Sequence, residues 1–209
     1  MNPKQLLPPF LLAVSFLVGC ATPAPPAQNP KFDTSKVDEV TILSVIDARD
    51  DKSKAFKFDK MLANPTADKL KGKGYKARVV LDPSLVIKIT QDAVAKADPN
   101  WIKSLGPTDS YWIFVWSVRE VSHRVAAVET PFSTPNTGLL NWGPKGKSGM
   151  SAILFDKTTG TIAWQEEQLM ETRAGGGLLG MALAGLVDND AIKAGFQSIM
   201  RSFPVKSSR

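Results

Sequence analysis

The segment Ser110–Val118 constrains the fold of this chain more than any other stretch. Its sequence, SYWIFVWSV, is aromatic or β-branched at almost every position. Such residues are typical of strands, and strands with apolar residues at successive positions are buried on both faces. We therefore expect this segment to be a central strand of a sheet that is buried on both sides.

Strands and helices alternate in the part of the chain that precedes it. Residues 40–46 and 75–81 are predicted strands, the first a buried apolar run and the second an alternating pattern. Helices are predicted over 64–72, 82–97 and 98–106, each with a proline at its first turn, where the fixed φ of proline suits a helix. This alternation predicts an α/β fold.

A hairpin and a last helix complete the predicted fold. Residues 151–164 are two strands joined by the turn Asp156–Gly160, with glycine where positive φ is needed. The second strand is expected to run on to about Thr172. Asp188 is predicted to cap a final helix that ends at Pro204. We expect a single α/β domain over 36–209, in two or three layers, with a mixed sheet, helices packed on it and a C-terminal helix.

The first residues have the pattern of an export signal. Lys4 precedes a short apolar run, which is too short to span a bilayer as a permanent helix. The next four residues resemble the lipobox of bacterial lipoproteins: Leu17, Val18, Gly19 and Cys20. The resemblance implies that residues 1–19 are a signal peptide and that Cys20 is acylated and becomes the first residue of the mature protein. The alternatives are an ordinary secretory signal with a chance cysteine and a soluble protein with an apolar start.

Residues 20–35 are predicted to tether the domain to the membrane. Ala21–Pro30 is rich in proline and alanine, and such an extended segment spans roughly 30 Å at about 3.1 Å per residue. In Gram-negative lipoproteins an aspartate directly after the cysteine favours the inner membrane. Ala21 stands at that position, which implies the periplasmic face of the outer membrane.

Charge and cysteine content exclude several classes of function. The formal net charge is +6, but an exported protein rarely meets nucleic acid, so anionic lipid or an acidic partner is the more plausible counterpart. The basic residues concentrate between Lys52 and Arg78, where they either face an anionic surface or only keep the surface solvated. Because Cys20 is the only cysteine, lipidation leaves none for disulfides or thiolate chemistry.

The polar residues give weak candidates for catalysis or metal binding. His123 is the only histidine, so a site with several histidine ligands is excluded, and no nucleophile-elbow motif is present. Asp47, Asp50 and Asp51 could hold Ca²⁺ or Mg²⁺. Basic residues interleaved with them would compete for the carboxylates: Arg49, Lys52 and Lys54. We therefore expect this charged loop to be solvated, and we expect no catalytic residue, no metal and no cofactor.

Two segments are candidates for contacts with other molecules. Residues 130–147 form a long polar loop that could close over a ligand as a lid or simply connect two elements. Residues 174–187 are apolar and rich in glycine, which disfavours an isolated helix. We expect this second segment to face a partner or the membrane through Gly176, Gly177, Leu178, Leu179 and Gly180. The alternative is a flexible connection tucked into its own domain.

Several features of the chain together resemble a group of bacterial periplasmic lipoproteins. They are Asp47-Ala48-Arg49 after the first strand, Lys73-Gly74-Tyr75, the aromatic strand, the Asp156–Gly160 turn with its trailing Trp164, and the glycine-rich segment before the last helix. The fold of that group is similar to the N-terminal domain of TolB and to the α/β domain of the curli-secretion lipoprotein CsgG. The resemblance covers residues 40–203 and implies a role in envelope assembly or maintenance rather than a reaction.

We therefore expect a lipoprotein of the outer membrane that acts as a non-catalytic interaction or assembly component of the envelope. Its expected partners are the membrane, through its lipid, and an envelope protein, for which a CsgG-like protein is one candidate and a second copy of this chain another. The main alternative is a lipid- or small-ligand-binding protein that uses the 130–147 loop as a lid. A hydrolase built on His123 is the third hypothesis.

Overall fold

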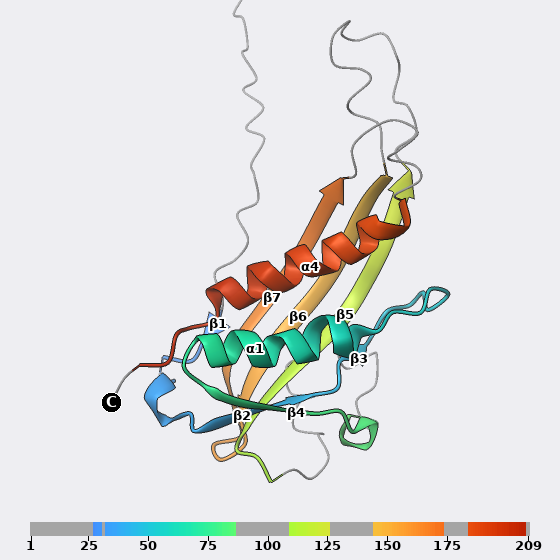
Figure 1. Ribbon diagram of the computed structural model, residues 1–209. Coiled ribbons are helices and arrows are strands. Elements are labelled where there is room, and N and C mark those ends of the chain that lie inside the picture. Colours follow the sequence, from blue (N-terminus) through green and yellow to red (C-terminus); the bar gives the residue numbers. More distant parts are fainter. Residues whose placement is uncertain (1–26, 31, 87–108, 126–143, 174–183, 208–209) are drawn as a thin grey trace, which may run out of the picture.

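A computed structural model describes residues 27–30, 32–86, 109–125, 144–173 and 184–207 (Figure 1). Its centre is a seven-stranded mixed sheet in the order β1-β7-β6-β5-β2-β4, with β3 paired to β5. The strands are β1 (Ala27–Gln28), β2 (Glu39–Leu43), β3 (Ile46–Asp47), β4 (Lys76–Val80), β5 (Trp112–Val125), β6 (Pro144–Asp156) and β7 (Thr161–Arg173). The helical elements are η1 (Thr34–Lys36), η2 (Asp59–Ala63), α1 (Asn64–Gly72), η3 (Pro83–Leu85) and α4 (Ala184–Ser202). The predicted α/β fold with a C-terminal helix is confirmed.

The sheet combines a parallel half with an antiparallel half. β2 pairs in parallel with β4 on one side and with β5 on the other, whereas β5, β6 and β7 form an antiparallel meander. These last three strands are much longer than β2, β3 and β4, and they project past them (Figure 1). β5 also contains a bulge between Val118 and Glu120. Because a bulge bends and twists a strand, it changes the direction of β5 where its parallel neighbours end.

One face of the sheet is covered by α1 and α4 (Figure 1). Phe203, just after α4, contacts the rings of Tyr75, Phe114 and Trp164 at centroid distances of 5.6, 5.7 and 4.8 Å. Trp116 is fully buried and donates its indole N–H to Thr66 Oγ1 of α1 at 2.8 Å. Large aromatic rings therefore join the sheet to both helices, and they contribute much of the buried apolar surface.

The opposite face of β5 is buried as well. Ile113 and Val115 belong to a second apolar cluster, which also contains Leu43 of β2 and Phe155 of β6. The side chains of β5 therefore alternate between two buried faces, with Phe114 and Trp116 toward the helices. The expectation of a central strand buried on both faces is confirmed. Of the helices predicted over 82–97 and 98–106, only η3 lies within the described residues.

Three element boundaries differ from the prediction. The helix expected to start at Asn64 is preceded by a π-helical turn, η2, so the helical backbone begins at Asp59. β6 begins at Pro144, which places the last four residues of the predicted 130–147 loop in the sheet. α4 begins at Ala184, so Asp188 lies inside the helix and not at its cap. In each case pairing or packing with a distant segment extends an element beyond its local signal.

Two residues of the segment assigned to the tether pair with the sheet. Ala27 and Gln28 form β1 opposite Gln165 and Trp164 of β7. Asn29 then donates its backbone N–H to the carbonyl of Ala163 at 3.0 Å. Strand pairing fixes the path of the chain next to β7 before the predicted start of the domain. Within the described residues, no helix is both long and apolar enough to span a bilayer.

Candidate functional site

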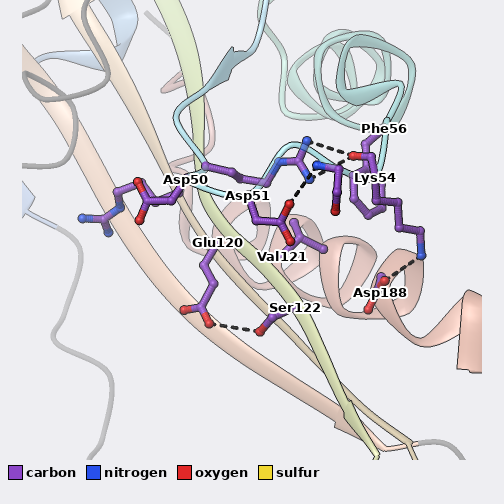
Figure 2. Close-up of a pocket in the computed structure, with 11 residues that line it drawn as sticks. Asp50, Asp51, Lys54, Phe56, Glu120, Val121, Ser122 and Asp188 are labelled. Carbon is purple, nitrogen blue, oxygen red and sulfur yellow. Dashed lines mark hydrogen bonds and ion pairs between the residues drawn. The ribbon is translucent and has the colours of Figure 1, made fainter.

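A cleft of about 390 Å³ lies where β5 extends past β3 (Figure 2). The loop between β3 and η2 forms one wall, β5 forms another, and the start of α4 closes the inner end. The lining residues are Arg49, Asp50, Asp51, Ser53, Lys54 and Phe56 from the loop, Arg119, Glu120, Val121 and Ser122 from β5, and Asp188 from α4. The cleft is thus built from three segments far apart in the sequence.

Arg49 fixes the loop wall. Its side chain donates from Nε and Nη2 to the two carboxylate oxygens of Asp47, each at 2.8 Å, and from Nη1 and Nη2 to the carbonyl of Lys54 at 3.2 and 3.1 Å. The guanidinium also lies 4.8 Å from the ring centroid of Phe56 and 5.0 Å from that of Phe58. Arg49 is 3% exposed, so a buried, bidentate cation shapes the loop from inside.

Both carboxylate oxygens of Asp47 accept hydrogen bonds from Arg49. Burial opposes its ionisation, but the hydrogen bonds and the charge of Arg49 outweigh burial and hold the pKa of Asp47 below its ordinary value. Asp47 therefore stays ionised and serves as the counterion of Arg49. A group of acidic or histidine side chains that could hold a metal ion is absent from the part of the chain that the structure describes.

A second ion pair ties the loop to α4. Lys54 Nζ lies 2.7 Å from Asp188 Oδ2 and 5.2 Å from the ring centroid of Phe56 (Figure 2). The side chain of Asp188 is 2% exposed, whereas that of Lys54 is 43% exposed. The lysine therefore reaches from the surface into the cleft to a buried carboxylate, and it sets the distance between loop and helix.

The β5 wall exposes a strand edge. β2 and β3 pair with β5 only as far as Val118, whose carbonyl also accepts the backbone N–H of Ala48 at 2.9 Å. Beyond Val118, no strand of the described ranges pairs with this side of β5. Its other side remains paired with β6 as far as Val125. An edge of this kind presents backbone N–H and C=O groups toward the cleft.

The charges of the cleft divide into paired and solvent-facing groups. Arg119 is ion-paired with Glu167, and Glu120 with Lys147 at 3.1 Å. Asp50 and Asp51 are exposed at the mouth, and within the described residues neither forms an ion pair. The side-chain and backbone hydrogen bonds of Ser53 hold the pKa of Asp51 below its ordinary value. Among the lining residues, the solvent-facing charges are therefore those of Asp50 and Asp51, while the cations of the walls are paired.

A second hollow, of about 610 Å³, lies at the other end of the sheet near Arg78 and Tyr111. Arg78 donates from Nη2 to Ser110 Oγ at 2.6 Å and from Nε to Thr41 Oγ1 at 2.9 Å. It also lies 3.6 Å from a carboxylate oxygen of Glu39. Arg78 is thus held by polar groups of the hollow itself. The first cleft is the stronger candidate because it adjoins an unpaired edge.

The structure tests only some of the residues predicted to function. Asp47 is held by Arg49, whereas Asp50 and Asp51 lie at the mouth of the cleft. His123 lies on β5 opposite Gly146 of β6. The lipidation site Cys20, the lipobox residues Leu17, Val18 and Gly19, and the segment Gly176–Gly180 lie outside the described residues, as does most of the 130–147 loop.

Sequence reasoning missed the pairing of Lys54 with Asp188. Asp188 carried a helix-cap signal, and Lys54 belonged to a charged loop that was expected to be solvated. The one available sign was an aspartate at a predicted helix start, directly after Val187 and four residues before Ile192. That pattern fits a surface cap equally well, so only the packing of α4 against the loop reveals the pair.

Comparison with known proteins gives likenesses of fold. No family model and no curated protein matches this chain. Similar solved structures include the PelC dodecamer from Paraburkholderia phytofirmans, with a TM-score of 0.46, 10% identity and coverage of 86% of this chain and 96% of that chain. Lipoprotein GNA1162 from Neisseria meningitidis gives a TM-score of 0.40 at 14% identity over 74% of this chain and 98% of that chain.

A minor lipoprotein from Acinetobacter baumannii gives a TM-score of 0.35 at 8% identity, over 79% of this chain and 91% of that chain. Two of the three proteins named are lipoproteins. At these identities and TM-scores the likeness carries no information about activity or partners. The predicted similarity to TolB and CsgG stays a prediction.

Proposed function

We propose that this protein is a lipoprotein of the bacterial envelope, anchored through Cys20 at the periplasmic face of the outer membrane, that binds an extended segment of another envelope protein. The segment lies in the cleft between the β3–η2 loop and β5. The role is one of binding and assembly, without a catalytic step.

The observation that carries this proposal is the edge of β5. A strand edge next to an open cleft is a template on which an extended peptide adds as a further strand, with main-chain hydrogen bonds supplying affinity. The Arg49 cluster and the Lys54–Asp188 pair hold the opposite wall in place. A preformed wall lowers the ordering cost of binding.

The charge of the mouth indicates the chemistry of the partner segment. Among the lining residues, Asp50 and Asp51 are exposed, whereas the cations Arg49, Lys54 and Arg119 each have a carboxylate partner. Lys52 is exposed next to them but does not line the cleft. Complementary charge favours encounter and disfavours wrong partners. The bound segment is therefore expected to carry lysine or arginine.

The alternative of lipid or small-ligand binding is less well supported by this cleft. Sites for acyl chains and drug-sized ligands are mostly apolar with a few polar groups. Here the walls are largely charged, and Phe56 and Val121 are the apolar side chains among the lining residues. The polar walls suit a solvated peptide backbone better than an acyl chain.

The experiment places a photo-crosslinking amino acid at Asp51 or at Ser122, on opposite walls of the cleft, in cells that express the full chain. Lys193 is the matched control position because it is exposed on α4 and does not line the cleft. We expect both cleft positions, but not Lys193, to capture the same peptide of one envelope protein, and mass spectrometry should show that this peptide carries basic residues. Cys20→Ser should release the protein from membranes and reduce the adduct.

Three outcomes would overturn the proposal. They are adducts of equal yield at all three positions, capture of a second copy of this chain, and capture of lipid in place of peptide. Retention of the Cys20→Ser variant in the membrane fraction would overturn the anchor in particular. The cleft and the anchor are thus tested by separate readouts.

A further inference from the structure

The chain joins the sheet and leaves the last helix at the same end of the domain. β1, the end of α1 and the end of α4 lie together at this end (Figure 1). After β1, Phe32 donates its backbone N–H to Asn29 O at 2.8 Å and its ring packs 5.8 Å from that of Trp112. The path from β1 to η1 is therefore fixed to the body of the domain.

Hydrogen bonds connect η1, the end of α1 and the segment after α4. Thr34 Oγ1 accepts the backbone N–H of Ser207 at 3.0 Å, and Lys206 donates from Nζ to Val37 O at 2.6 Å. Lys73 Nζ donates to Phe203 O at 2.6 Å, and Tyr75 Oη donates to Pro204 O at 3.2 Å. These contacts make one continuous surface out of three segments.

This surface carries an excess of exposed cations. We call it the basic end and define it by Lys69, Lys71, Lys76 and Arg201, all of which are exposed. Within the described residues none of the four forms an ion pair with a carboxylate. Burial and the neighbouring charge of Lys69 lower the pKa of Lys73, which shows that like charges lie close together here.

The carboxylates at this end only partly offset these cations. Asp33 pairs with Lys36 at 3.8 Å and Glu39 with Arg78 at 3.6 Å, so each faces a cation of its own. The exposed carboxylates without such a pair, within the described residues, are those of Asp38, Asp68 and Asp109. Three carboxylates stand against these four cations, and the half-buried Lys73 and Lys206 add further positive charge, so the basic end is positive. Val205, which is 66% exposed, adds an apolar side chain to it.

The length of the tether brings this end close to the membrane. Seven residue steps separate Cys20 from Ala27. An extended chain covers about 3.3–3.6 Å per residue, so the anchor holds β1 within about 25 Å of the lipidated cysteine. This step rests on the proposed lipid anchor. The pairing of β1 with β7 makes the tether shorter than the roughly 30 Å expected from the sequence.

We propose that the basic end docks on anionic headgroups of the bilayer that holds the lipid anchor. Lysine and arginine side chains near an anionic surface each add attraction, and the attraction decays within a Debye length. A covalent lipid and a basic surface together bind a membrane more stably than either does alone. Docking at this end orients the domain, so the C-terminal end of β5, which lies away from β1 (Figure 1), points away from the membrane.

The experiment uses the full lipidated protein, reconstituted in vesicles of phosphatidylcholine alone or mixed with phosphatidylglycerol. Because Cys20 is the only cysteine and is acylated, Val205→Cys gives a unique site for a fluorescent label. Quenching by a headgroup-bound nitroxide then reports contact of the basic end with the bilayer. The test variant is Lys69→Glu/Lys71→Glu, and the matched control, Lys52→Glu/Lys193→Glu, makes the same change in net charge elsewhere.

We expect quenching in the mixed vesicles, little in phosphatidylcholine alone, and loss of quenching at high salt. One charge near an anionic surface changes the ratio of docked to undocked protein about fivefold, so the double reversal should lower it by more than about tenfold. The control variant should behave like the parent protein. Equal quenching in both vesicle types, or an equal loss in both variants, would overturn docking by the basic end. Protein that floats with neither vesicle would instead overturn the lipid anchor.

Discussion

Lys54 and Asp188 are 134 residues apart in the sequence, yet their side chains form an ion pair of 2.7 Å at the inner end of the cleft. Asp188 is 1% exposed, so the lysine compensates a carboxylate that has lost most of its hydration. The pair joins the β3–η2 loop to α4. The shape of the cleft therefore depends on the stability of this contact.

We predict that Lys54→Met lowers the free energy of unfolding by about 1–3 kcal/mol, because it removes a charged partner from a buried carboxylate. Lys57→Met is the matched control, since Lys57 is exposed in the same loop, and it should change stability by less than about 0.5 kcal/mol. Urea unfolding of both variants measures the difference. Adding Asp188→Asn should recover part of the loss in Lys54→Met; identical midpoints for the two single variants would show that the ion pair contributes nothing.

A second prediction concerns the contact of β6 with α4. A Cβ added at Gly146 would lie 2.5 Å from the carbonyl oxygen of Val187 and 2.7 Å from its Cγ1. Backbone cannot give way as a flexible side chain can, so Gly146→Ala should cost about 1–3 kcal/mol through overpacking. It should also displace the start of α4, which carries Asp188.

Gly72 at the end of α1 offers the opposite case. A Cβ there would meet nothing within 4 Å, and the residue is helical. Gly72→Ala should therefore stabilise the protein by up to about 1 kcal/mol, because alanine loses less backbone entropy on folding. Thermal unfolding of the two variants should shift in opposite directions. A Gly146→Ala protein as stable as the parent would mean that β6 and α4 are not in close contact.

A third prediction concerns pH and the buried Glu166 of β7. This residue is 5% exposed, and one carboxylate oxygen accepts the Nε2–H of Gln168 at 2.8 Å, while the other has no hydrogen-bond partner among the described residues. Burial raises the pKa of Glu166 above its ordinary value of 4.5, against the smaller effect of the Gln168 hydrogen bond. The neutral form is therefore favoured in the folded state.

The sign of the linkage follows from this shift. Below pH 4.5 the carboxyl is neutral in the folded and unfolded states, and its contribution is fully present. As the pH rises, the unfolded chain ionises first, so stability falls until the folded state ionises as well. Glu166→Gln should therefore become more stable relative to the parent as the pH increases from about 4 to 8.

Unfolding free energies of parent and Glu166→Gln over that pH range provide the measurement. Glu171→Gln is the matched control, because Glu171 lies on the same strand with an exposed side chain. A difference between parent and Glu166→Gln that does not change with pH would contradict the raised pKa.

Local sequence signals predicted the strands and turns of the central sheet. The aromatic run was expected to be a buried central strand, and β5 carries Phe114 and Trp116 on one buried face and Ile113 and Val115 on the other. The turn before Thr161 has Gly160 at φ +65°, as the prediction required. The strand and the turn depend on side-chain type and backbone conformation within a few residues, so both can be predicted from local sequence.

The candidate cleft was not predictable in the same way. The sequence placed Asp47, Asp50 and Asp51 in one charged loop, but it could not show that Arg49 would be buried against two phenylalanine rings and paired with Asp47. The expected solvated loop is instead held from inside by that cation. Burial of a charge depends on which distant segments pack around it.

The sequence by itself determined strands β2, β4 and β5, the β6–β7 hairpin, the C-terminal helix and the expectation of a lipidated Cys20, because each depends on residues that are neighbours along the chain. Only the tertiary structure decided that Ala27 pairs with β7, that β5 extends beyond its parallel neighbours, and that Lys54 forms an ion pair with Asp188. Strand register and loop-to-helix contacts are set by the packing of the whole domain, and no local pattern encodes them.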